Sequence, residues 1–159
     1  MKKTILTSLL LIFCCSLFAQ KISTNKKALI ASVEKHKNEL IKISDSIWAL
    51  AETAFNETGS AELLANYAEK NGMTVTRGVA DIPTAFTATY GSGSPVISIL
   101  GEFDALPGIS QKASPIKEAL NPGAAGHGCG HNLFGTASLG SAIAIKELMD
   151  AGKIKGTVK

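Results

Sequence analysis

The sequence predicts an α/β fold, in which helices pack against a β-sheet. Apolar residues recur at helical spacing before residue 72 and after residue 132. Between them lie short stretches that alternate in polarity or are rich in β-forming residues. One of these, Pro95 to Gly101, is nearly continuously apolar, which indicates a strand covered on both faces at the centre of an α/β sheet.

A targeting segment opens the chain. Two lysines precede a mostly apolar run over residues 5–18, which is too short to span a bilayer comfortably. We interpret residues 1–19 as a signal peptide, cut after Ala19 or the residue that follows it. We therefore expect a periplasmic or secreted protein without stable membrane association after signal removal. Lipid attachment at Cys14 or Cys15 is less favoured, because a bulky residue precedes the first of them.

Residues 20–159 are enough for one domain with a core of its own. Loss of the two leading lysines lowers the formal charge from +3 to +1, and no basic stripe remains, so we expect no nucleic-acid partner. Cys129 is then the single cysteine, which excludes an internal disulfide. Its thiol is predicted to be buried, reactive or metal-bound.

Three helices are predicted: residues 23–53, residues 61–71 and residues 133–151. Asn56 to Ser60 is predicted to form the turn before the second of these helices. His36 lies among lysines on the polar face of the first helix, so we expect it to be solvated. The first half of the third helix is apolar nearly all round, so we expect it to be buried.

Short strands are predicted between the second and third helices. Residues 73–77 and 85–90 would pair at the margin of a sheet, and the apolar run 95–101 would be central. Lys155 to Lys159 would begin another strand. Ligands in open α/β sheets bind beyond the carboxyl ends of the strands, which indicates a site at Gly101–Asp104.

The most informative stretch is Gly126-His127-Gly128-Cys129-Gly130-His131-Asn132, at the end of a long loop. In extended backbone, alternate residues point to the same side, so His127, Cys129 and His131 could project into one space. A thiolate with an imidazole suits zinc. A glycine loop around a buried free cysteine is the structural alternative. The acidic pair within Gly101–Asp104 favours the metal site.

Two motifs carry a family resemblance: Gly101-Glu102-Phe103-Asp104-Ala105-Leu106-Pro107-Gly108, followed by residues 126–132. At this separation they resemble the metal-dependent amidohydrolases of the aminoacylase and carboxypeptidase (dizinc peptidase) family, above all its aminobenzoyl-glutamate hydrolase branch. Residues 78–86 resemble that branch as well. The resemblance implies a twisted mixed sheet flanked by helices, with a lid and dimerisation domain inserted further along. We therefore expect residues 20–159 to be the N-terminal part of the catalytic domain.

The resemblance also implies a centre of two divalent ions, zinc or manganese. Cys129 and His131 match the family's thiolate and imidazole ligands. Asp104 matches the catalytic-site acid that supports the metals and orients a ligand. Glu102 stands where more distant relatives have a metal-binding histidine, and it is not assigned as a ligand. The motif positions left without a role are His127 and Asn132, the latter an aspartate in many relatives.

The function implied is hydrolysis of small amide bonds, in N-acyl amino acids or aminobenzoyl-glutamate-like substrates, by a metal-activated water. A dipeptidase of the β-alanyl-lysine type is the alternative among enzymes, and an inactive metal-binding fragment or scaffold is the alternative of another class. A Cys129 nucleophile with a histidine base is less favoured, because the glycine-rich spacing suits shared metal ligation better. The general base and the other ligands would lie beyond Lys159, so residues 1–159 alone are expected to be inactive. The full-length protein is expected to be a homodimer or a hetero-oligomer.

Overall fold

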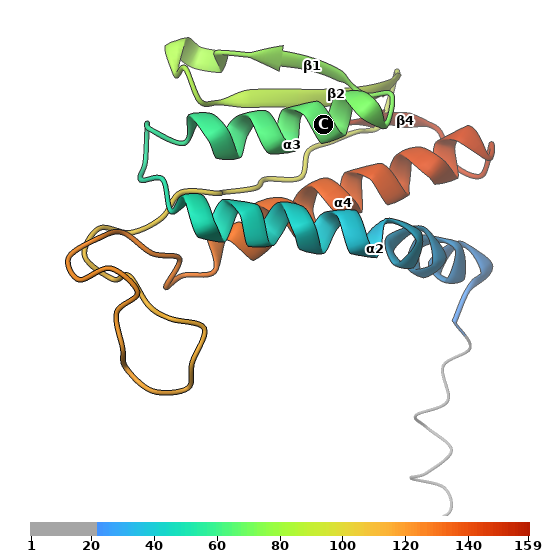
Figure 1. The fold of residues 1–159 in the computed structure, drawn as a ribbon. Helices are drawn as coiled ribbons and strands as arrows, with labels where there is room; N and C mark the ends of the chain where they lie inside the picture. Colours follow the sequence, from blue (N-terminus) through green and yellow to red (C-terminus); the bar gives the residue numbers. More distant parts are fainter. Residues whose placement is uncertain (1–21) are drawn as a thin grey trace, which may run out of the picture.

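The computed structural model describes residues 22–159; the predicted signal peptide at residues 1–19 lies outside this part. Helices α2 (Thr24–Leu50) and α4 (His131–Asp150) run side by side in opposite directions, on one side of a four-stranded sheet (Figure 1). Helix α3 (Thr58–Lys70) contacts both the helices and the sheet. The predicted α/β class is confirmed. Within residues 22–159, no helix is long and apolar enough to cross a membrane.

The sheet is mixed, with the strand order β1-β2-β4-β3. The strands are β1 (Thr74–Arg77), β2 (Phe86–Ser92), β3 (Val96–Ile97) and β4 (Gly156–Val158), with a short 3-10 helix, η1 (Val79–Asp81), between the first two. β1 and β2 pair antiparallel at one margin, as predicted, and β4 runs antiparallel to β2 and parallel to β3. Gly91 has φ +84°, and a Cβ there would lie 2.3 Å from the carbonyl oxygen of Gly156, so the β2–β4 contact requires glycine.

Four elements meet in one hydrophobic core. Its largest fully buried apolar side chains are Ile47, Leu64, Ile143 and Val158, one each from α2, α3, α4 and β4. Helix α4 approaches α2 closely at Gly140, where an added Cβ would lie 2.8 Å from Leu40 Cδ1. Burial of this shared apolar surface is the main favourable term that holds the helices on the sheet.

The prediction of a central, doubly covered strand at residues 95–101 is wrong. Only β3 (Val96–Ile97) is strand, and it lies at the margin of the sheet with its two residues 56% and 53% exposed. Leu133 and Phe134 in the first turn of α4 are also exposed, against the prediction of a buried first half. A continuous apolar run shows only that a segment can be buried, and within residues 22–159 these side chains are covered only in part.

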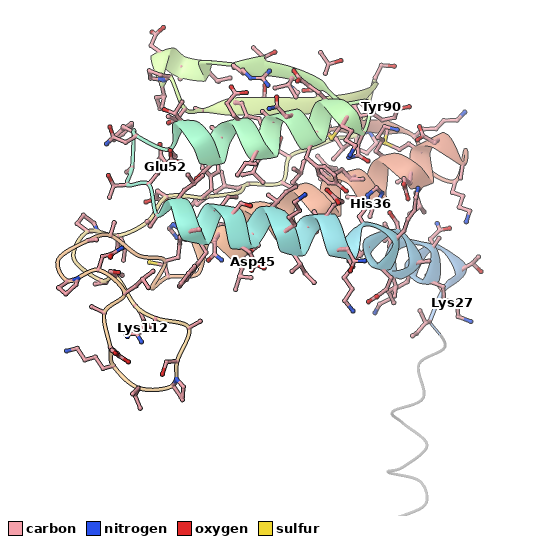
Figure 2. All side chains as sticks on the ribbon, in the orientation of Figure 1. Lys27, His36, Asp45, Glu52, Tyr90 and Lys112 are labelled. Atoms are coloured by element: carbon pink, nitrogen blue, oxygen red, sulfur yellow. The ribbon has the colours of Figure 1, made fainter. Side chains whose placement is uncertain are left out.

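Helix α3 begins at Thr58, inside the segment predicted as a turn. Its first turn is capped from outside the helix by Glu52, which lies between α2 and α3 (Figure 2). The Glu52 carboxylate accepts hydrogen bonds from the N–H groups of Gly59 and Ser60, at 2.9 and 2.8 Å. Burial raises the pKa of Glu52, but the hydrogen bonds from Ser60 and Gly59 outweigh it and hold the pKa below its ordinary value.

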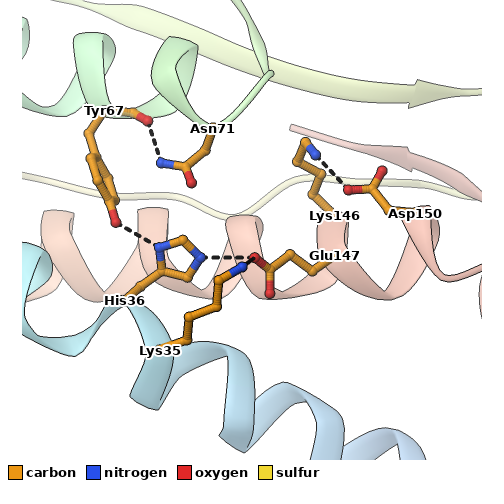
Figure 3. A network of polar contacts seen from close by, with 7 residues as sticks. All are labelled: Lys35, His36, Tyr67, Asn71, Lys146, Glu147 and Asp150. Carbon is orange, nitrogen blue, oxygen red and sulfur yellow. Dashed lines mark hydrogen bonds and ion pairs between the residues drawn. The ribbon is translucent and has the colours of Figure 1, made fainter.

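The prediction that His36 is solvated is also wrong, because its side chain is only 13% exposed and joins three helices (Figure 3). His36 Nε2–H donates to the carboxylate of Glu147 on α4 at 2.9 Å. The bare Nδ1 then accepts from the hydroxyl of Tyr67 on α3 at 2.7 Å. Lys35 binds the same Glu147 oxygen at 2.7 Å. We call His36, Tyr67, Glu147 and Lys35 the polar clip.

The polar clip should make the folded state less stable at acid pH. Burial raises the pKa of Glu147, but hydrogen bonds from Lys35 and His36 outweigh it and bring the pKa from 4.5 down to about 2. The folded state therefore gains stability that is complete above pH 4.5 and disappears as the pH falls towards 2. We expect Glu147→Gln to lower the free energy of unfolding by up to about 3 kcal/mol at pH 6, and by much less at pH 2.5.

Urea unfolding at the two pH values measures this difference. Glu34→Gln is the matched control, because Glu34 is 63% exposed and pairs only with the neighbouring Lys37, an arrangement worth about 0–1 kcal/mol. Equal losses at pH 6 and pH 2.5 in Glu147→Gln would show that its charge does not stabilise the fold.

Candidate active site at the start of helix α4

The two predicted motifs meet at one end of the molecule, where α2 ends and α4 begins (Figure 1). The backbone groups of Leu106 and Gly126 exchange two hydrogen bonds of 3.0 Å, which tie the first motif to the second. The Glu102 backbone also lies against α4, since a Cβ at Gly135 would be 2.8 Å from the Glu102 carbonyl oxygen. Glycine at position 135 thus permits the approach of the acidic segment to the helix.

The last turns of α2 and the residues just beyond it hold both motifs in place. The N–H of Ala105 donates to the carbonyl oxygen of Glu52 at 2.7 Å. His127 Nε2–H donates to the carbonyl oxygen of Ile47 at 3.0 Å. The side-chain amide of Asn132 donates to the hydroxyl of Ser44 at 3.1 Å. These bonds give His127 and Asn132 a role in positioning the loop, which the sequence left open.

The expectation that His127, Cys129 and His131 alternate along extended backbone is wrong. The chain turns at Gly128 and Cys129, and the N–H of Gly130 donates to the carbonyl oxygen of His127 at 3.2 Å. Gly130 has φ +79°, which glycine adopts without strain, and His131 is already the first residue of α4. The glycines of this motif therefore allow a turn, and the alternation of a strand does not apply.

His131 lies between two carboxylates. Its Nδ1 is 2.7 Å from Asp104 Oδ1, and its Nε2 is 2.9 Å from Glu102 Oε2. Asp104 accepts only, so Nδ1 must carry a proton, while Nε2 faces an oxygen of Glu102. A carboxylate behind a histidine in this way fixes the tautomer and orientation that metal-binding histidines have in proteins. Glu102, which the sequence left unassigned, is the further residue that the structure brings to this ring.

Cys129 is exposed, so it is not the buried hydrophobic residue of the structural alternative. Nor does it hydrogen-bond to a histidine in the part of the chain that the structure describes, as a nucleophile and base would. Its accessible sulfur two residues before His131 is the kind of donor that zinc prefers. The thiol of Cys129 and Nε2 of His131 are thus donor atoms of the chemical type that the predicted metal centre needs.

The positions of these side chains fit a metal centre only in part. Among residues 22–159, no three or more histidine, cysteine, aspartate or glutamate side chains come close enough together to hold one metal ion. Asp104 and His131 are brought together by a hydrogen bond, whereas the Cys129 thiol is not part of that pair.

His127 presents a different environment from His131. Since Nε2 donates to Ile47, Nδ1 is bare, and it is buried without a hydrogen-bond partner among residues 22–159. Burial lowers the pKa of His127 below its ordinary value, and the nearby His131 lowers it further. A neutral ring suits the role of tethering the loop to α2.

A cavity of about 330 Å³ opens beside His127, between the end of α2 and the long loop. Its walls include Trp48, Ile109 and Leu120, together with residues 124–128. A concave space lined by both apolar and polar groups can hold a small molecule.

The chain has relatives among known proteins, although no family model matches it. Over 129 residues, 47% are identical to the B subunit of p-aminobenzoyl-glutamate hydrolase from Escherichia coli (strain K12); the match covers 80% of this chain and 27% of that protein. The chain thus spans about a quarter of the length of this curated relative.

Two solved structures share the fold. One is from methicillin-resistant Staphylococcus aureus and was assigned as an aminohydrolase; it matches with a TM-score of 0.67 at 25% identity, over 83% of this chain and 33% of that chain. The other is Bacillus subtilis YxeP, a dinuclear metal-binding peptidase of the M20 family, with a TM-score of 0.59 at 24% identity, over 77% of this chain and 34% of that chain. The chain is therefore related in sequence to the B subunit of p-aminobenzoyl-glutamate hydrolase and shares its fold with these two solved structures, which confirms the family resemblance of its two motifs.

Proposed function

We propose that the protein to which this chain belongs is a metal-dependent hydrolase of small amide bonds, with N-acyl amino acids or aminobenzoyl-glutamate-like compounds as substrates. The observation that carries the proposal is the Asp104–His131 pair, 2.7 Å apart; the exposed thiol of Cys129 comes two residues before His131 in the chain. Support comes from the names of the relatives, a hydrolase of p-aminobenzoyl-glutamate and a dinuclear metal-binding peptidase.

In this proposal the residues of the chain prepare a metal centre. Asp104 keeps the proton on Nδ1 of His131, so that Nε2 offers its lone pair. Cys129 supplies a thiolate, and both residues would hold zinc or manganese. A divalent ion bound there would supply Lewis-acid polarisation of the amide carbonyl and a bound water of lowered pKa. The cavity beside His127 would receive part of the substrate.

Two further features of the whole protein belong to the proposal. The relative in Escherichia coli is named as one subunit of its enzyme, which supports assembly of the full-length protein with a different subunit. The leading lysines and the apolar run of residues 5–18 support export to the periplasm or the medium.

Metal content of the full-length protein tests the ligand assignment. We expect Cys129→Ser and His131→Ala each to reduce bound zinc or manganese sharply, because each removes a donor atom. Asp104→Asn should weaken metal affinity by about 10–100-fold, as expected for an outer partner of a ligand. Asp150→Asn is the control, since that carboxylate binds Lys146 at the other end of α4. Unchanged metal-to-protein ratios in both Cys129→Ser and His131→Ala, by elemental analysis, would exclude the assignment.

Turnover of aminobenzoyl-glutamate and a panel of N-acyl amino acids by the full-length protein tests the reaction. We expect a chelator to abolish hydrolysis and added zinc or manganese to restore it, because the nucleophilic water depends on the ion. Asp104→Asn should lower kcat/KM by at least about tenfold while Asp150→Asn leaves it unchanged. Full turnover by metal-stripped protein would contradict a metal-dependent mechanism.

Export can be tested in the native host. We expect mass spectrometry of the mature protein to give an N-terminus at Gln20 or Lys21, after removal of the signal peptide. An intact Met1 on protein in the cytoplasmic fraction would rule this out.

A further inference from the structure

A cavity of about 350 Å³ lies in the plane of the sheet, just beyond the end of β4. Residues 86–88 of β2 form one wall, residues 98–101 form the other, and α4 closes one side. We call this cavity the slot. We propose that the slot takes an extended strand, and that this strand is the segment that follows Lys159 in the longer protein to which the chain belongs. This goes beyond the proposed function, because neither a metal ion nor a substrate takes part.

Two registers lead the same residues into the slot. β4 runs antiparallel to β2 with Val158 opposite Tyr90, so each step forward along β4 is one step back along β2. β4 runs parallel to β3 with Val158 beside Ile97, so each step forward there is also one step forward along the neighbour. The first three residues after Lys159 would therefore lie between Ala88 and Ile99, between Thr87 and Leu100, and between Phe86 and Gly101. All six of these flanking residues line the slot.

The hydrogen bonds of the parallel pair already reach the entrance of the slot. The N–H of Lys159 donates to the Ile97 carbonyl oxygen at 2.9 Å, and the N–H of Ile99 donates to the Lys159 carbonyl oxygen at 2.8 Å. Such bonds are evenly spaced along a parallel pair. The next two would join the second residue after Lys159 to the Ile99 carbonyl oxygen and to the Gly101 N–H. Among residues 22–159 neither group has a hydrogen-bond partner, so both are available.

The side chains around the slot agree on which face each incoming residue would occupy. Val158 is 1% exposed, and alternation along a strand would place the first and third residues after Lys159 on the same face. That face is apolar, since Ala88 and Ile99 pack against the hydrophobic core there. The second residue would point the other way, beside Leu100, which is 72% exposed. We therefore expect an apolar residue directly after Lys159.

The occupant that fits best belongs to the same protein. Lys159 itself lines the slot, so a strand from another molecule would have to begin against the end of β4. The chain spans about a quarter of the length of its curated relative, which supports a longer protein with residues to supply. A strand in the slot would pair both walls and cover apolar surface that water otherwise contacts. Its carboxyl end would leave the sheet beside Glu102, at the edge where ligands of α/β sheets bind.

Disulfide cross-linking in the full-length protein tests this register. Thr87→Cys and a cysteine at the second residue after Lys159 would lie opposite each other, with Cα atoms about 4.5–5.5 Å apart, which a disulfide can span. Thr76→Cys with the same second cysteine is the matched control. Thr76 pairs with Thr87 on the other side of β2, so it would be two strands away, about 9–10 Å, which is too far. We expect mild oxidation to join the first pair within one molecule and to leave the second pair unjoined, with peptide mass mapping to exclude pairs with Cys129.

Hydrogen exchange on the unaltered full-length protein is the second measurement, and it needs no variant. We expect the Gly101 N–H to exchange at least about 100-fold more slowly than in an unstructured peptide, because a paired amide exchanges only when the sheet opens. Exchange of Gly101 at the unstructured rate would overturn the inference. So would a Thr87 cross-link that joins two molecules, or no cross-link in a variant that keeps its thermal midpoint. Both measurements are made without metal or substrate, so the proposed function is tested separately.

Discussion

The arrangement of the site depends on the carbonyl groups at the end of α2. The last carbonyls of a helix have no partners within the helix. Here the Ile47 oxygen accepts from Ala51 N–H at 3.1 Å and from His127 Nε2–H at 3.0 Å, and the Glu52 oxygen just beyond accepts from Ala105 N–H. Both motif segments lack regular structure around these bonds, so the helix end replaces the hydrogen bonds that a sheet or helix would supply.

At the start of α4 the backbone groups without partners in the helix are N–H donors. Gly130, the residue before this helix, supplies no side-chain cap to the N–H groups of the first turn, where His131 lies. The N-terminus of a helix favours negative charge and disfavours a cation. Glu102 and Asp104 place two carboxylates on the ring of the first helical residue. Their negative charge lies at the helix end that favours anions, and it offsets the helix dipole near the ring of His131.

Local signals predicted the long helices and the two motifs well, because periodicity along α2 or α4 and the order of residues in a motif are properties of the sequence itself. The errors occurred where a residue's environment comes from far along the chain. His36 is partly buried because of Glu147, 111 residues later. The start of α3 depends on a hydrogen bond from Ser60 to Glu52 on the other side of a turn. The exposure of β3 depends on which other segments pack against it. For the site, Asp104 does lie against His131, but Glu102 could not be paired with that ring from spacing alone.

Packing of α2 on α4 links the polar clip to the site without any direct contact. His131 and Glu147 both lie on α4, and the roughly 16 residues between them span about 24 Å at 1.5 Å per residue, so the two polar clusters lie at opposite ends of the helix pair. Between them, the contact of Gly140 with Leu40 leaves no space for even one added carbon atom. A slide of α2 along α4 would therefore have to break the clip at one end and withdraw the Ile47 carbonyl from His127 at the other. The clip thus helps to fix the helix register on which the hydrogen bond of His127 depends.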